Sequence, residues 1–109
     1  MKIHVEIYIA ARLLAQNHPT FSPQDLINFI QREFGDERPG VHTHATAVCI
    51  ANAPLHHPNS YNYLWRVSHG EMHLFQPSQD LPHPDRVNAP TQPQRADMPA
   101  KYLHLLRPE

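Results

Sequence analysis

The sequence predicts a mainly helical α+β fold, with three helices, then a β-hairpin, then a proline-rich arm. Apolar residues recur at helical spacing in the first half of the chain, and strand-forming residues flank a glycine turn further on. Six of the twelve prolines lie between residues 76 and 99, which excludes regular helix and central strand there. We therefore expect a compact domain over residues 2–76, an extended arm over 77–98 and an apolar docking segment over 99–109.

The first helix is predicted over residues 3–17. Its apolar side chains form one stripe at helical spacing, with Glu6 and Arg12 off that stripe. The helix is expected to end at His18-Pro19, because a residue before proline disfavours helical geometry. The stripe consists of Ile3, Ile7, Ala10 and Leu14.

The second helix, within residues 21–35, has the clearest start and stop signals in the chain. Ser22 is a natural N-cap, Pro23 occupies the first helical position, and Asp25 resembles the acidic member of a capping box. Gly35 is a plausible C-terminal stop. The buried stripe is expected to consist of Leu26, Ile27, Ile30 and Phe34.

A third helix is predicted over residues 41–52, ending before Pro54. Its two faces follow from residues that recur at i, i+4, i+7 and i+11. Small inward residues would let this helix pack closely on the other two. The inward face is expected to hold Val41, Ala45, Val48, Cys49 and Asn52, and the outward face Thr43, Thr46, Ala47, Ile50 and Ala51.

Residues 61–76 are rich in aromatic and β-branched side chains, which favours strands. The segment "SHGE" supplies a glycine turn, so residues 64–67 and 72–75 are expected to pair as a hairpin. Three helices followed by a hairpin is the outline of a winged helix-turn-helix. In that arrangement the third helix enters a groove of DNA and the hairpin touches the neighbouring backbone.

The segments "GVHTHATAVCIANAPLHH" and "YNYLWRVSHGEMHLFQP" resemble a family of small prokaryotic winged helix-turn-helix domains of unassigned detailed function. These domains occur alone or attached to restriction-endonuclease-like and other DNA-directed proteins. The resemblance covers residues 3–76 and implies DNA binding by the third helix and the hairpin. This chain departs from the family pattern at His42, His69 and His73, where a basic residue is expected, and at Gly40, where a Ser or Thr cap is expected.

The charge distribution favours the middle of the chain as the surface that meets a phosphate backbone. The formal net charge is −1, which argues against nonspecific nucleic-acid binding. Residues 38–70 contain two arginines and no acid. We expect the third helix and the hairpin to present one common, acid-free surface to double-stranded DNA. The expected contacts are Arg38, His42, Thr43, His44, Thr46, Ala47, Arg66, His69 and His73.

Each of these contacts has a second interpretation. Thr hydroxyls and imidazoles can bond to base edges, and small methyl groups can meet thymine. Equally, the third helix could present a tolerated outer face, including Ile50, to another protein. Arg66 and His69 could be a phosphate contact, or a cross-strand charge and a turn residue. The predicted function is a DNA-binding transcriptional regulator or accessory module, and the alternative is a protein-interaction module.

The ten histidines raise the question of a metal, but their spacing matches no structural zinc site. His42 and His44 would point about 200° apart on a helix. His56 and His57 are expected to shape the turn before the hairpin. We expect no metal or other cofactor, and no enzyme, because Cys49 lies on the buried stripe and no catalytic motif is present.

The last residues bear on assembly and location. Tyr102, Leu103, Leu105 and Leu106 should dock on the domain itself or cross to a second copy, which would give a homodimer. No apolar run approaches the ~20 residues of a membrane span, and no signal-peptide pattern is seen at the N-terminus. A cytoplasmic protein is therefore expected.

Overall fold

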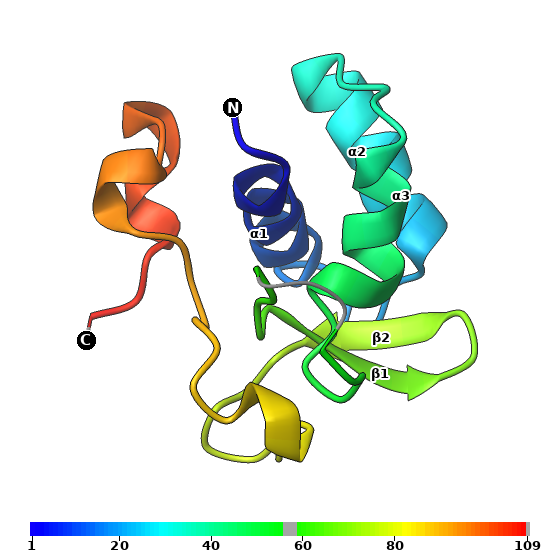
Figure 1. Ribbon diagram of the computed structural model, residues 1–109. Coiled ribbons are helices and arrows are strands. Elements are labelled where there is room, and N and C mark those ends of the chain that lie inside the picture. The colour runs from blue at the N-terminus through cyan, green and yellow to red at the C-terminus, as the bar shows by residue number, and fades with distance from the viewer. Residues whose placement is uncertain (56–58, 109) are drawn as a thin grey trace.

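The structure, a computed structural model, describes residues 1–55 and 59–108. It confirms a mainly helical α+β fold with a two-stranded antiparallel hairpin (Figure 1). The main elements are α1 (Ile3–Leu14), α2 (Pro23–Phe34), β1 (Leu64–Ser68), β2 (Glu71–Leu74) and a third helix made of α3 (Gly40–Thr43) and a π-helical turn, η1 (His44–Val48). Short 3₁₀ helices follow: η2 (Pro84–Arg86), η3 (Arg95–Asp97) and η4 (Ala100–Leu105). None of these helices is long and apolar enough to cross a membrane.

α1 is the central element of the core. Its residues from Val5 to Ala11 are all buried, because α2, the third helix, β2 and η4 all contact it. The expectation of a single buried stripe was therefore wrong for this helix. In particular Glu6, expected on the open face, is only 2% exposed.

α2 begins and ends as its local sequence predicts. The Ser22 hydroxyl accepts a hydrogen bond from the Asp25 backbone N–H at 3.1 Å, and the Asp25 carboxylate accepts one from the Ser22 N–H at 2.9 Å. Gly35 closes the helix with a φ of 65°, a left-handed conformation that glycine adopts without strain. Leu26 and Ile30 are buried against the core.

The third helix is shorter than predicted and ends at Val48. Beyond it Ile50 forms a single parallel β-bridge with Leu64 of β1. The Ala51 N–H bonds to the Leu64 carbonyl at 2.7 Å, and the Leu64 N–H bonds to the Cys49 carbonyl at 3.0 Å. Ile50 and Ala51 are therefore buried, which corrects the expectation that both lie on an outward helical face.

The hairpin is held on both sides. β1 and β2 pair with Leu64 opposite Leu74 and Arg66 opposite Met72, with an irregularity between Arg66 and Ser68. Gly70, with a φ of 75°, forms the turn. On the edge of β2 that faces away from β1, Phe21 exchanges two backbone hydrogen bonds with Met72, each 2.9 Å long. The hairpin is thus joined to the start of α2 as well as to the segment after the third helix.

The core does not stop at residue 76. Arg86, Met98, Tyr102 and Leu105 are buried in it, and the Tyr8 hydroxyl donates to the Leu105 carbonyl at 3.0 Å. Figure 1 shows this C-terminal segment on the other side of α1 from α3. The apolar end of the chain therefore docks on its own domain.

Candidate nucleic-acid interface

An open groove of about 590 Å³ lies between the start of α2, the third helix and the tip of the hairpin. Four of the predicted contact residues line it together. His42 and Thr46 come from the third helix, and Arg66 and His69 come from the hairpin. The two elements that the sequence assigned to DNA recognition therefore do share one concave surface.

Arg66 is positioned by contacts on both its backbone and its side chain. The Asn52 amide donates to the Arg66 carbonyl and accepts from the Arg66 N–H, both at 2.8 Å. One guanidinium nitrogen, Nη2, donates to the Thr46 carbonyl at 2.7 Å. Because a guanidinium carries five N–H donors, the exposed Arg66 still has donors to offer a bound anion.

Arg38, one of the expected DNA contacts, does not line the groove, and its guanidinium binds groups of the protein itself. Its Nη2 lies 2.7 Å from Asp36, 3.2 Å from Glu6 and 2.9 Å from the Met1 carbonyl. The signal missed in the sequence was Asp36, two residues before Arg38 and just outside the acid-free stretch. This arginine is therefore engaged by Asp36, Glu6 and the Met1 carbonyl of the protein itself.

The remaining predicted residues also lie away from the groove lining. His44 Nδ1 is 2.8 Å from the Gly40 carbonyl, and Thr43 is half-buried. The Ala47 carbonyl accepts from Arg86. His73 pairs with Trp65 in the register adjacent to the Arg66–Met72 pair, so it points to the other face of the hairpin. There its Nδ1 lies 3.8 Å from the Asp80 carboxylate.

The surface was expected to be free of acidic residues. This was wrong, because the exposed Glu71 lines the groove. With neutral imidazoles, the charges of Arg66 and Glu71 cancel. If both His42 and His69 are protonated, the groove carries two net positive charges. The floor is apolar and includes Ile27, Ile50 and Met72.

Arg86 is the residue that sequence reasoning missed most completely. It is fully buried, and its guanidinium donates to four backbone carbonyls at 2.8–3.2 Å, those of Ala47, Val48, Pro54 and Tyr61. Two of these carbonyls belong to the last turn of the third helix, where a cation is electrostatically favourable. Nothing in the local sequence marks this arginine of the proline-rich arm as a helix cap.

Over residues 1–55 and 59–108, no set of three or more His, Cys, Asp or Glu side chains could hold a metal ion. Cys49 is buried, and burial raises the pKa of its thiol well above the usual value. His56 and His57, expected to shape the turn, lie outside the described residues.

Comparisons with models of protein families, with curated proteins and with solved structures gave no match to this chain. The function is therefore inferred from the groove itself and from the sequence resemblance given above.

Proposed function

We propose that this chain is a winged-helix DNA-binding module, acting as a transcriptional regulator or a DNA-targeting accessory module. The third helix enters a groove of the duplex, and the hairpin is the wing that touches the backbone. The observation that carries the proposal is the shared concave surface, with His42 and Thr46 on one wall and Arg66 and His69 on the other. The resemblance to small prokaryotic winged helix-turn-helix domains supports it.

The side chains of this groove suit a division between base and phosphate contacts. His42 is exposed on the third helix, where its imidazole can donate to a base edge or a phosphate. The Thr46 hydroxyl donates to the His42 carbonyl at 2.8 Å and keeps its lone pairs for an incoming donor. Arg66 and His69 on the hairpin would contact phosphate, which positions the protein without reading sequence.

The affinity of this surface for DNA should depend on pH. Histidine is the side chain that most readily gains a positive charge between pH 8 and pH 6. Protonation of His42 and His69 would add two positive charges to the groove. Positive charges on the protein release counterions from the phosphate backbone and so raise the affinity.

The test is fluorescence anisotropy of a random-sequence duplex between pH 8 and pH 6 at constant ionic strength. We expect the affinity to rise about tenfold, since two weak charge contacts are each worth up to about 1 kcal/mol. A variant with both His42→Gln and His69→Gln should lose the rise. No binding at either pH, or a rise that the double variant retains, would contradict the proposal.

One observation favours a second function, a protein-interaction module. The charges of Arg66 and Glu71 in the groove balance each other, and the partly exposed Ile27 adds an apolar contact. Binding of a protein partner there would be insensitive to salt, whereas DNA binding weakens steeply as salt rises. If the chain fails to bind DNA but binds a protein partner through this groove at high salt, the result would support this alternative.

A further inference from the structure

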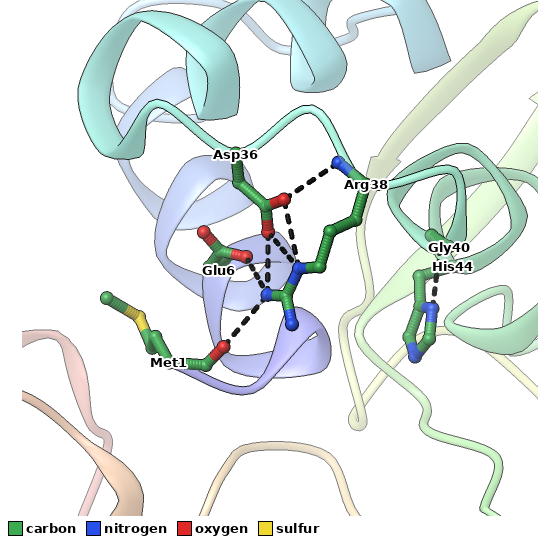
Figure 2. A network of polar contacts seen from close by, with 6 residues as sticks. All are labelled: Met1, Glu6, Asp36, Arg38, Gly40 and His44. Carbon is green, nitrogen blue, oxygen red and sulfur yellow. Dashed lines mark hydrogen bonds and ion pairs between the residues drawn. The ribbon is translucent and has the colours of Figure 1, made fainter.

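Glu6, Asp36 and Arg38 form a compact network, here called the Glu6 cluster, on the side of α1 next to the third helix (Figure 2). Arg38 donates through Nε to both oxygens of Asp36, at 2.9–3.0 Å, and through Nη2 to Glu6. The two carboxyl groups contact the same nitrogen, Arg38 Nη2, which lies 2.7 Å from Asp36 and 3.2 Å from Glu6. One guanidinium therefore donates hydrogen bonds to two carboxyl groups.

The Glu6 cluster lies next to the start of the third helix, which carries His42. The Arg38 carbonyl accepts from the Val41 N–H at 3.1 Å, which begins the third helix. Gly40 packs so closely on α1 that an added Cβ would lie 2.9 Å from the Ile3 side chain. The start of the third helix is thus fixed to α1 by the Glu6 cluster and by this contact.

The two carboxyl groups cannot both be ionised without strong repulsion. Asp36 receives four hydrogen bonds from Arg38, one from the backbone N–H and three from the side chain, which favours its charged form. Glu6 is 2% exposed and has only one Arg38 contact, at 3.2 Å. Glu6 is therefore the member that keeps its proton, and a protonated carboxyl group can donate to Asp36.

We propose that Glu6 is a pH-sensitive anchor of the third helix, which holds the helix start on α1 while it is protonated and loosens it on ionisation. The anchor itself does not depend on DNA. Its consequence for DNA rests on the proposed function, since a loosened segment over residues 36–44 would hold His42 less firmly. Both this anchor and the groove histidines would favour binding at lower pH.

The pKa values agree with this arrangement. Burial, and after it the hydrogen bond and charge of Asp36, raise the pKa of Glu6 from 4.5 to about 7, against the opposing effect of Arg38. The Arg38 hydrogen bond, followed by that of Glu6, lowers the pKa of Asp36 well below its usual range. Figure 2 also shows Met1, whose carbonyl accepts from Arg38 Nη2 at 2.9 Å, and His44, whose Nδ1 lies 2.8 Å from the Gly40 carbonyl.

The sign of the effect on stability follows from these directions. Below pH 4.5, Glu6 is protonated in both the folded and the unfolded chain. Between 4.5 and about 7 the folded chain keeps the proton that the unfolded chain has lost, so the free energy of unfolding falls as the pH rises. Asp36 contributes oppositely, with stability that is present above its unfolded pKa of 3.8 and lost on acidification below it.

The test measures amide hydrogen exchange of the full chain at pH 6 and pH 8, with each rate corrected for intrinsic exchange. We expect protection of residues 36–44 to fall about tenfold relative to α2, the factor that one unit of pKa difference represents. Glu6→Gln, a neutral side chain of the same shape, should lose this pH dependence. Glu37→Gln, which removes an exposed carboxylate of the same loop, should keep it.

A direct titration of the wild-type chain covers the case in which Glu6→Gln does not fold. The carboxyl carbon resonance of Glu6 should titrate with a midpoint near pH 7. A midpoint close to 4.5, or equal loss of protection in wild type and Glu6→Gln, would overturn the anchor. Because DNA is absent from both measurements, failure here is distinct from failure of the proposed function.

Discussion

At the scale of single residues, most of the arginines that could have contacted a nucleic acid bind groups of the protein itself. Arg38 bonds to Asp36 and Glu6, and Arg86 bonds to backbone carbonyls. Only Arg66, among the three, lies in the groove. Charge counting along the sequence could locate the acid-free stretch but could not show this, because a guanidinium reaches partners in distant segments. Glu71, just past that stretch, enters the groove because it follows Gly70 at the tip of the hairpin.

Substitution of Glu71 tests whether this carboxylate faces bound DNA. Glu71→Gln removes the carboxylate from the groove, so a duplex should bind about two- to fivefold more tightly at low salt, the effect of up to about 1 kcal/mol from one exposed charge. The gain should shrink as salt is raised, because exposed charges are screened. Anisotropy titrations at about 50 and about 200 mM salt measure it, because phosphate contacts weaken strongly over this range. The matched control is Glu37→Gln; equal effects from both variants would show that Glu71 does not face the DNA.

Among the elements, the sequence predicted correctly those boundaries that are set by neighbouring residues, and it failed where a boundary depends on contacts with distant segments. The start of α2 was predicted correctly because Ser22, Pro23 and Asp25 lie within one helical turn of one another. The end of the third helix was wrong by four residues, from 52 to 48, because it depends on a cap from Arg86 and on pairing with β1. The start of the hairpin depended on short-range composition and was placed correctly.

Arg86 provides the test at this scale. Arg86→Met keeps much of the volume but leaves four backbone carbonyls without their cationic donor. We expect a loss of at least about 3 kcal/mol in the free energy of unfolding, since each unsatisfied buried group costs about 1–3 kcal/mol. Urea denaturation measures it. The control Arg95→Met, at an exposed arginine of the same arm, should change stability by less than about 0.5 kcal/mol. Similar stability for both variants would contradict a capping role.

For the whole molecule, the proline-rich arm completes the fold and leaves the groove open. Arg86 binds the end of the third helix, and Tyr102 donates to Glu33 of α2 at 2.6 Å. The sequence indicated that the apolar end should dock, but it left open whether on its own domain. Its place beside α1 was not predicted, because α1 had been expected to bury one stripe and to leave its other faces open. The continuous apolar run of residues 5–11, apart from Glu6, was the available signal of a helix covered all round.

The central claim is that the groove between the third helix and the hairpin is the surface that meets DNA. Two-dimensional NMR of the full chain, titrated with a duplex at pH 6, tests it most directly. The account predicts that the largest amide shift changes occur at His42, Thr46, Arg66 and His69, which come from both walls of the groove. Changes confined to the proline-rich arm or to the far side of α1, with these four residues unmoved, would contradict it.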